Sequence, residues 1–504
     1  MVFLRPWSIV AALSALTYVH GFDFNFGSDD IAYDFNAASQ QVPVVTPQAP
    51  QPANLSSLAE GGFTVLRHPA FKKYQVRIKK GKFCDPAVNS YTGYIDIEAR
   101  HLFFYFFESR GNPAKDDVIF WTNGGPGCSS SLGLFMELGP CRILDEDGPK
   151  QHFESWNTNA NIFFIDQPVG VGFSYAEYGE YVSTTEEAAK DIAAFVSIFF
   201  NTFEEFKGRA FHMAGESYGG RYIPLFASAV YDNNAKLIEQ GLEPVNLKSI
   251  MIGNGMTDTF KMILAYYDMQ CRPSIRSTAV LPVGECMAAK SVLKRCEEWM
   301  KKDCQDSYDA VNCAASVGFC MQAIETPFMN SGLNPYDMSK PCEGSVATTL
   351  CYPITRHITN YLSRPDVRSN LGVDPAVTGN FTSCSNKVGA AFNEQQDMLH
   401  PTKDYVAALL ERGVRVLIYV GAYDWICNWI GNERWTLSLE WSRQREFASM
   451  PLKDWFVNGK AAGKTRSVKD FSFVTIEGAG HMVPYDKPQE SLIMLQRWLA
   501  GDDF

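Results

Sequence analysis

Short, continuous apolar segments bounded by turn residues recur along the chain, and segments with helical spacing of apolar residues lie between them. Apolar runs of this length, without polar alternation, are typical of strands that are covered on both faces. They occupy residues 118–122, 162–166, 211–215, 247–253, 414–421 and 471–477, and helices are expected over 186–203 and about 218–231. This alternation predicts an α/β fold with a mostly parallel central sheet and helices on both faces.

The alternation stops between about residues 256 and 393. This stretch has mixed periodicity, and eight of its nine cysteines lie within residues 271–351, namely Cys271, Cys286, Cys296, Cys304, Cys313, Cys320, Cys342 and Cys351. Their spacing includes no CxxC pair, so disulfide bonds are a better interpretation than zinc. We therefore expect a disulfide-rich cap inserted into the core fold, with no metal and no cofactor.

The first residues predict export. Arg5 precedes an apolar stretch that ends near Tyr18, and residues 19–21 resemble a cleavage site, so residues 1–21 are interpreted as a signal peptide. The stretch is too short for a transmembrane anchor. Residues 22–62 include a run rich in proline and glutamine and are expected to form a propeptide or a flexible N-terminal arm. The folded domain is then 63–504, and Asn54 and Asn380 begin N-glycosylation sequons.

Composition narrows the range of partners. The 504 residues carry a net charge of −11 at pH 7, and 46% of them are hydrophobic. An acidic, globular chain of this kind does not suit nucleic acid or an anionic membrane as a partner. With no further segment long enough to span a bilayer, we expect a lumenal or exported protein without a membrane anchor.

One pentapeptide carries the signature of a nucleophile. Gly215-Glu-Ser-Tyr-Gly219 matches G-x-S-x-G and lies between a predicted strand and a predicted helix. Such a sharp turn projects the serine hydroxyl above the sheet in the α/β-hydrolase fold, in which an acid and then a histidine follow along the chain. Asp424 and His481 each follow a predicted core strand in that order. Ser217, Asp424 and His481 are therefore the expected catalytic triad.

Acyl transfer by such a triad also needs two N–H donors for the oxyanion. The backbone N–H of Tyr218, the residue after the nucleophile, is expected to be one of them. The other is expected from the turn Asn123-Gly-Gly-Pro-Gly127, where glycine permits close approach of the backbone to a substrate.

These motifs together resemble the serine carboxypeptidase family. The resemblance rests on the segments WTNGGPGCSS (121–130), GESYGG (215–220) and GHMVP (480–484), and ICNWIG (426–431) looks most like the carboxypeptidase Y group. It implies hydrolysis of the last peptide bond of peptides and proteins with a free C-terminus, through an acyl-enzyme and favoured at acidic pH. It also implies an oxyanion hole at Gly125 and Tyr218, and binding of the substrate carboxylate by Asn123, Glu137 and Glu216, with Trp121 beside them.

The resemblance further implies a pattern of disulfide bonds. The implied pairs are Cys128–Cys384, Cys271–Cys286, Cys296–Cys320, Cys304–Cys313 and Cys342–Cys351, with Cys427 as a free thiol near the site. Cys84 and Cys141 have no counterpart in that pattern. Counting suggests that they pair, and two free thiols is the alternative.

Three functions are compatible with these residues. The first is the carboxypeptidase, secreted or in a vacuolar or lysosome-like lumen. The second is an acyltransferase, lyase or other hydrolase that uses the same triad, and the third is a non-catalytic binding or chaperone protein that retains the fold. The complete triad weakens the third, and the complete set of Asn123, Glu137 and Glu216 weakens the second.

Overall fold

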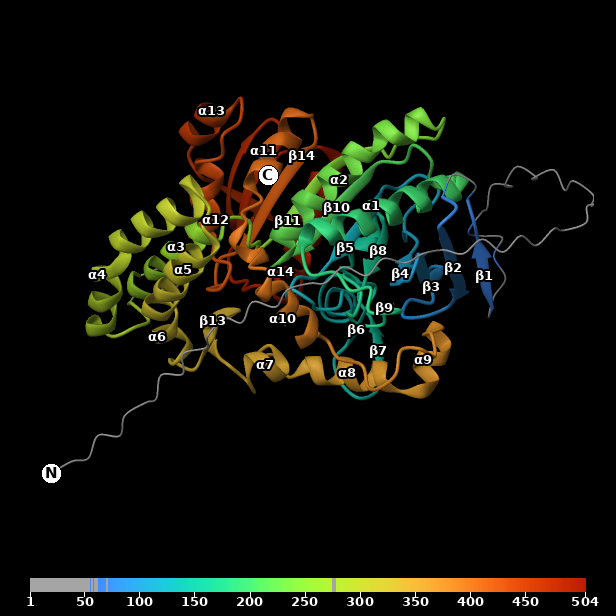
Figure 1. The fold of residues 1–504 in the computed structure, drawn as a ribbon, viewed down its shortest axis with the longest axis horizontal. Helices are drawn as coiled ribbons and strands as arrows, with labels where there is room; N and C mark the ends of the chain where they lie inside the picture. Colours follow the sequence, from blue (N-terminus) through green and yellow to red (C-terminus); the bar gives the residue numbers. More distant parts are fainter. Residues whose placement is uncertain (1–54, 56–57, 59–61, 69–70, 274–277) are drawn as a thin grey trace, which may run out of the picture. The chain divides into compact units, whose positions relative to one another are not determined.

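The centre of the fold is a set of parallel strands (Figure 1), each buried along most of its length. In spatial order they are β8 (Asn161–Ile165), β5 (Val118–Thr122), β10 (Phe211–Glu216), β11 (Leu247–Gly253), β14 (Arg415–Gly421) and β17 (Phe471–Ile476). All six were predicted from their apolar runs, and the pairing between neighbours is parallel throughout. The computed structural model describes residues 55, 58, 62–68, 71–273 and 278–504.

Antiparallel strands extend this sheet at both edges, so that it contains thirteen strands within the described residues. On one side lie β1 (Phe63–Leu66), β2 (Tyr74–Gly81), β3 (Ser90–Ile97) and β4 (Arg100–Phe107), with β9 (Tyr175–Ala176) paired to β4; on the other lie β16 (Lys460–Val468) and β15 (Lys453–Val457). The sequence did not predict these edges. Together with the parallel centre they form the mixed sheet of an α/β-hydrolase fold.

Helices cover both faces of the sheet, because alternate residues of each central strand face opposite sides. Phe120 packs in one core with α1 (Thr185–Thr202), α2 (Gly219–Glu239) and α11 (Lys403–Glu411). Trp121 packs in the other core with Trp156 and with α15 (Pro488–Ala500). The remaining elements around the core are the π-helical turn η2 (Gly133–Glu137), β6 (Cys141–Ile143), β7 (Pro149–Gln151), α12 (Trp429–Leu437), α13 (Gln444–Ser449), α14 (Val483–Asp486) and the short helical turns Trp156–Thr158, Glu204–Phe206 and Asp397–Leu399.

The predicted cap is a mainly helical insertion. Its elements are α3 (Thr259–Cys271), α4 (Val283–Met300), η5 (Lys301–Asp306), α5 (Ala310–Ile324), α6 (Thr326–Met329), β12 (Leu333–Asn334), β13 (Asp337–Pro341), α7 (Val346–Thr349), α8 (Ile354–Ser363), α9 (Pro365–Leu371) and α10 (Asn386–Glu394). Helices α3 to α6 bury a small core of their own. Helices α7, α8 and α9 pass along the lower edge of the fold in Figure 1, and α10 lies just above them in this view.

The described residues include all thirteen cysteines, of which twelve form six disulfides and Cys427 is free. Five of the pairs are those implied by the family resemblance. The sixth joins Cys84 to Cys141, which settles the alternative that the sequence left open in favour of a bond.

The predicted signal peptide, most of the predicted arm 22–62 and the sequon residue Asn54 lie outside the described residues. Two described residues of that arm, Leu55 and Leu58, are buried in the core, and Leu55 N donates to Glu205 Oε1 at 3.0 Å. Asn380, the other sequon residue, is exposed. Within the described part of the chain, no helix combines the length and the apolar character needed to cross a membrane.

Candidate active site

Ser217 occupies a strained turn between β10 and α2. Its φ is +64°, a left-handed conformation that non-glycine residues rarely adopt and that is found where the surrounding structure imposes it. The turn is fixed on both sides, since Ser217 N donates to Gly253 O at 3.1 Å and Ser217 O accepts from Met256 N at 2.9 Å. This geometry is that of a nucleophile elbow, in which the hydroxyl stands above the carboxyl edge of the sheet.

Asp424 and His481 meet at the carboxyl ends of β14 and β17. Asp424 Oδ2 lies 2.7 Å from His481 Nδ1, and both residues are buried. The carboxylate also accepts hydrogen bonds from Ile426 N at 3.1 Å and Cys427 N at 3.3 Å. A carboxylate facing Nδ1 holds the proton there, so His481 Nε2 is left as the proton acceptor.

Cys427 connects the nucleophile to this pair. Its thiol interacts with the Ser217 side chain, and its Sγ lies within 4.8 Å of the nearest oxygen of Asp424 and nitrogen of His481. The structure thus brings the predicted residues Ser217, Asp424, His481 and Cys427 to one place, although they come from three strand ends.

Asp424, Cys427 and His481 also form the one group among the described residues that has the side chains and spacing to hold a metal ion. The chemistry of Asp424 and His481 fits their place in a triad with Ser217 better than a metal site. The Asp424 oxygen is already committed to His481 Nδ1, and a metal would need the Cys427 thiolate. Burial raises the pKa of Cys427 well above its usual value, which keeps the thiol protonated.

The predicted oxyanion segments approach each other closely. A Cβ added at Gly124 would lie 2.3 Å from Tyr218 N, so this turn reaches the elbow only because the residue is glycine. Gly125 has φ +114°, which L side chains rarely adopt. The turn after β5 and the N-terminus of α2 therefore lie against each other beside Ser217.

Asn123, Glu137 and Glu216 form a buried polar cluster beside this turn. Asn123 Nδ2 donates to Glu137 Oε1 at 3.1 Å, and Trp121 Nε1 orients the Asn123 side chain through a 2.8 Å bond to Oδ1. Glu137 and Glu216 are almost fully buried, and their carboxyl groups are in hydrogen-bond contact with each other. A hydrogen bond between two carboxyl groups requires that one of them carries a proton.

The surroundings of the two glutamates favour their neutral, protonated forms. Burial raises the pKa of Glu216 well above its usual value, and the neighbouring charge of Glu137 raises it further. Burial also raises the pKa of Glu137. A pair of this kind retains a proton at mildly acidic pH and can donate a hydrogen bond from a carboxyl group.

Two residues of the site were not predicted. Asn254 follows β11 and donates through Nδ2 to Asp424 Oδ2 at 2.8 Å, and its position at a strand end was a signal that could have identified it. Arg142 donates to the backbone carbonyl of Glu137 at 2.7 Å, and no motif marks it.

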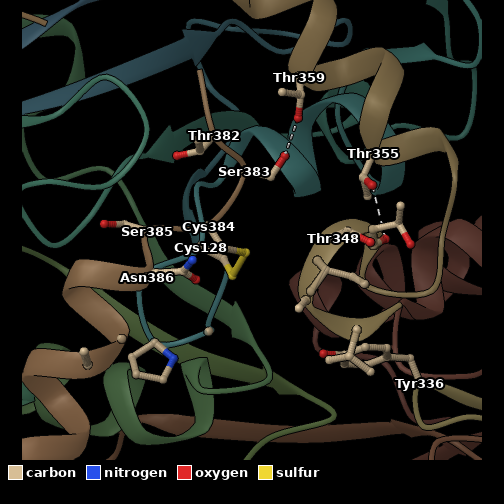
Figure 2. A pocket seen from close by; sticks show the side chains of 18 of the residues that line it. Cys128, Tyr336, Thr348, Thr355, Thr359, Thr382, Ser383, Cys384, Ser385 and Asn386 are labelled. Atoms are coloured by element: carbon tan, nitrogen blue, oxygen red, sulfur yellow. Dashed lines mark hydrogen bonds between the residues drawn. A yellow bond between two sulfur atoms is a disulfide. The ribbon is translucent and has the colours of Figure 1, made fainter. Parts of the chain in front are cut away.

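A cavity of about 620 Å³ opens beside the oxyanion turn. It borders Gly125 and Tyr336, whose ring lies 5.1 Å from that of His481. Figure 2 shows that hydroxyl and amide side chains surround it, among them Thr348, Thr355, Thr359, Thr382, Ser383, Ser385 and Asn386. No acidic or basic side chain is among its lining residues.

Comparison with known proteins agrees with this geometry. The family model described as serine carboxypeptidase matches residues 81–501. The chain is 40% identical to carboxypeptidase Y of Saccharomyces cerevisiae over 448 residues, 87% of this chain and 81% of the relative. It is 41% identical to carboxypeptidase Y of Candida albicans over 417 residues, 82% of this chain and 74% of the relative.

A solved structure shares the fold. It is Kex1Δp, a prohormone-processing carboxypeptidase from Saccharomyces cerevisiae, with a TM-score of 0.70, 24% identity, and coverage of 83% of this chain and 92% of that one. The match to the family model spans most of the chain, and the relatives share their identity over most of both lengths. This chain therefore belongs to the serine carboxypeptidase family and is a serine-type carboxypeptidase.

Proposed function

We propose that this enzyme removes the last residue of peptides and proteins that have a free C-terminus, with Ser217, His481 and Asp424 as its triad. One observation carries the proposal. Beside the nucleophile lies a buried cluster, Asn123, Glu137 and Glu216, in which two carboxyl groups with raised pKa values contact each other and the Asn123 amide lies beside them. A substrate carboxylate would accept hydrogen bonds from the Asn123 amide and from the protonated carboxyl group of the pair.

The reaction follows from the positions of the groups. Ser217 Oγ attacks the carbonyl carbon of the last peptide bond while its proton passes to His481 Nε2, and the oxyanion accepts hydrogen bonds from the N–H groups of Gly125 and Tyr218. The C–N bond then breaks, and the leaving amine takes the proton from His481. Water attacks the acyl-enzyme in the same way, giving its proton to His481, and Ser217 leaves with that proton.

Recognition of the C-terminus depends on a proton. The substrate carboxylate would be a third and could not approach two ionised glutamates, because like charges at short distance repel each other. The raised pKa of Glu216 supports a neutral carboxyl group that donates to the substrate, while Asn123 Nδ2 supplies another donor. Trp121 holds the Asn123 amide in that orientation.

We further propose that the cavity in Figure 2 receives the side chain of the leaving residue. Its lining includes Gly125, from the oxyanion turn, and Tyr336, which packs against the ring that protonates the leaving amine. The leaving residue must lie between these groups, since its nitrogen faces His481 and its carboxylate faces Asn123. The uncharged lining supports a preference for neutral C-terminal residues.

The expected compartment is the lumen of the secretory pathway, with the protein either secreted or in a vacuolar or lysosome-like compartment. Six disulfides support an oxidising environment. In this proposal residues 1–21 are the signal peptide, residues 22–62 are a propeptide or arm, and Asn54 and Asn380 carry glycans. Residues 63–504 with the cap at about 256–393 form the catalytic domain.

A comparison of three substrates tests the proposal. An N-blocked dipeptide with a free C-terminus should be hydrolysed at acidic pH with a much lower KM than its C-terminal amide. An acyl-glucose ester serves as the probe for acyltransferase chemistry. Turnover of that ester without turnover of the dipeptide would overturn the assignment.

A further inference from the structure

The backbone that follows Glu137 is unusually well anchored. Residues 138–142 run from the end of η2 into β6, and every residue of this segment has a side-chain or covalent attachment to another part of the fold. The attachments are Ser155 Oγ to Leu138 O at 2.9 Å, His152 Nδ1 with Gly139 O at 3.0 Å, Arg110 Nη2 to Pro140 O at 3.1 Å, the Cys84–Cys141 disulfide, and Arg142 with Glu137 O and Pro484 O.

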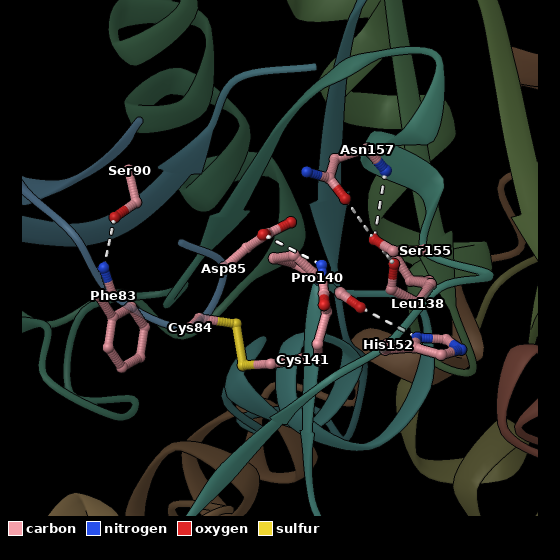
Figure 3. The surroundings of a disulfide bond; sticks show 12 residues. Phe83, Cys84, Asp85, Ser90, Leu138, Pro140, Cys141, His152, Ser155 and Asn157 are labelled. Atoms are coloured by element: carbon pink, nitrogen blue, oxygen red, sulfur yellow. Dashed lines mark hydrogen bonds between the residues drawn. A yellow bond between two sulfur atoms is a disulfide. The ribbon is translucent and has the colours of Figure 1, made fainter. Parts of the chain in front are cut away.

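The disulfide is the covalent part of this anchor. Figure 3 shows Cys141 joined to Cys84, which lies in the turn between β2 and β3. That turn is itself held, because the adjacent Asp85 is buried and its Oδ2 lies 2.7 Å from Arg110 Nε. Cys141 is fully buried, so the bond fixes the start of β6 against the edge of the main sheet.

Arg142, the next residue, reaches across the site. Its Nη2 donates to Glu137 O at 2.7 Å and to Pro484 O at 2.6 Å, and Nε also approaches Glu137 O at 3.3 Å. Pro484 is three residues beyond His481. One planar guanidinium thus joins the backbone of the carboxylate-binding Glu137 to the loop that carries His481.

We propose that Arg142, held in place by the Cys84–Cys141 disulfide, is a positioning residue that sets Glu137 relative to the His481 loop and thereby tunes affinity for the substrate carboxylate. The inference rests on the proposed function, in which Glu137 contacts that carboxylate. Arg142 acts through Glu137, because its Nε and Nη2 donate to the backbone carbonyls of Glu137 and Pro484.

Charge supports the same role. The positive charge of Arg142 lowers the pKa of Glu137 against the larger effect of burial, which raises it. The ionisable groups that face Glu137 are Glu216 from β10, His481 from the loop after β17, and Arg142 from β6; those that face Arg142 are Glu137, Glu154, Tyr485 and Asp486. Removing the guanidinium should therefore displace Glu137 and also raise the pH at which the pair loses its proton.

The test separates position from charge. Arg142→Met should raise the KM of an N-blocked dipeptide acid about tenfold, the effect of losing a charged hydrogen-bond partner, with kcat within about twofold. The pH at which this KM begins to rise should also move upward. Arg142→Lys keeps the charge and loses the planar fork, so KM should rise while its pH dependence stays in place. An ester of an N-blocked amino acid, which has no terminal carboxylate, should show an unchanged KM for both variants.

The disulfide is tested separately. Cys84→Ser with Cys141→Ser should raise the KM of the acid severalfold and leave that of the ester unchanged. The matched controls are the double variant Cys304→Ser with Cys313→Ser, in the cap, and Arg415→Met, which removes another half-buried arginine that donates to a backbone carbonyl, Trp498 O. Active sites are counted with a phosphonate, so that kinetic constants refer to folded enzyme alone.

An equal change in KM for acid and ester, or no change for either, would overturn the role of Arg142. A wild-type enzyme that does not prefer the acid over its amide would instead contradict the proposed function, before any variant is measured.

Discussion

Asn254 Nδ2 donates a 2.8 Å hydrogen bond to Asp424 Oδ2, the same carboxylate oxygen that faces His481 Nδ1. Asn254 Oδ1 in turn accepts from Gly421 N at 3.0 Å, so the amide is held at both ends. The amide thus fixes the carboxylate that orients the imidazole. Asn254 follows β11 and Asp424 follows β14, and these two strands are neighbours in the sheet.

Asn254→Ala should lower kcat about tenfold, because Asp424 loses a hydrogen bond that fixes its direction toward His481. KM for peptides should change little, since the carboxylate-binding cluster is untouched. Steady-state kinetics on an N-blocked dipeptide will measure both constants. Thr257→Ala, a buried hydroxyl nearby with no hydrogen-bond partner among the described residues, is the control for loss of packing. A kcat as high as that of the control would contradict this role.

Ser217→Ala should remove activity by a factor of about 10⁴ or more and leave the fold intact, because the hydroxyl is the nucleophile. The left-handed conformation at residue 217 is equally unfavourable for alanine, so the unfolding temperature should change little. Activity within tenfold of the wild type would exclude Ser217. Labelling by a phosphonate, present in the wild type and absent in the variant, is a second readout.

The central strands could be predicted because the signal that marks them, a continuous apolar run, is local in the sequence. A strand buried on both faces must be apolar along its length, and β5 and β11 have the bounds that the pattern gave. Strands β3 and β4 were missed although they are as deeply buried. They form a tight hairpin in which Glu98 has φ +54°, a conformation usually marked by asparagine or glycine. The turn therefore lacked its usual signal.

The residues of the site likewise divide into those that the strand pattern could locate and those that it could not. Ser217, Asp424 and His481 follow strands, and the topology of parallel strands brings their carboxyl ends to one edge. Asn254 obeys the same rule and was available to the same reasoning. Arg142 does not, because its role depends on Pro484, which lies 342 residues away along the chain and approaches it only through tertiary packing.

The uncharged cavity beside Tyr336 predicts a preference among C-terminal residues. Peptides that end in neutral residues should have a higher kcat/KM than those that end in lysine or aspartate, since a charged side chain finds no counter-ion in the lining. Thr382→Asp should increase kcat/KM for C-terminal lysine about two- to fivefold relative to leucine, because Thr382 is exposed and solvent weakens the new ion pair.

The control for this change is Thr382→Asn, which has the same shape without the charge. Dipeptides that differ only in the last residue isolate the contribution of the cavity. An unchanged ratio of lysine to leucine in the Asp variant would show that the leaving side chain lies elsewhere. Loss of all turnover would instead indicate damage to the adjacent oxyanion turn.

The raised pKa values of Glu137 and Glu216 set the direction of the pH dependence. Both groups are neutral below their shifted pKa values, and there the pair can donate to the substrate carboxylate. As pH rises through these values the pair becomes charged and repels the carboxylate, so KM for free-acid peptides should increase. The triad groups are not part of the pair, and kcat should vary less over the same range.

Esters and amides provide the contrast, because they present no carboxylate to the pair. Their KM should be flat, or should fall, as pH rises from acid to neutral. Replacing both glutamates by glutamine keeps a donor that does not titrate, so the KM of acids should lose its pH dependence in that variant. Glu154→Gln, a more exposed carboxyl on the far side of Arg142, is the matched control and should keep it. A wild-type KM for acids that is constant from pH 4.5 to 7.5 would refute the shared-proton account, since an ionised pair would then bind a carboxylate as well as a neutral one.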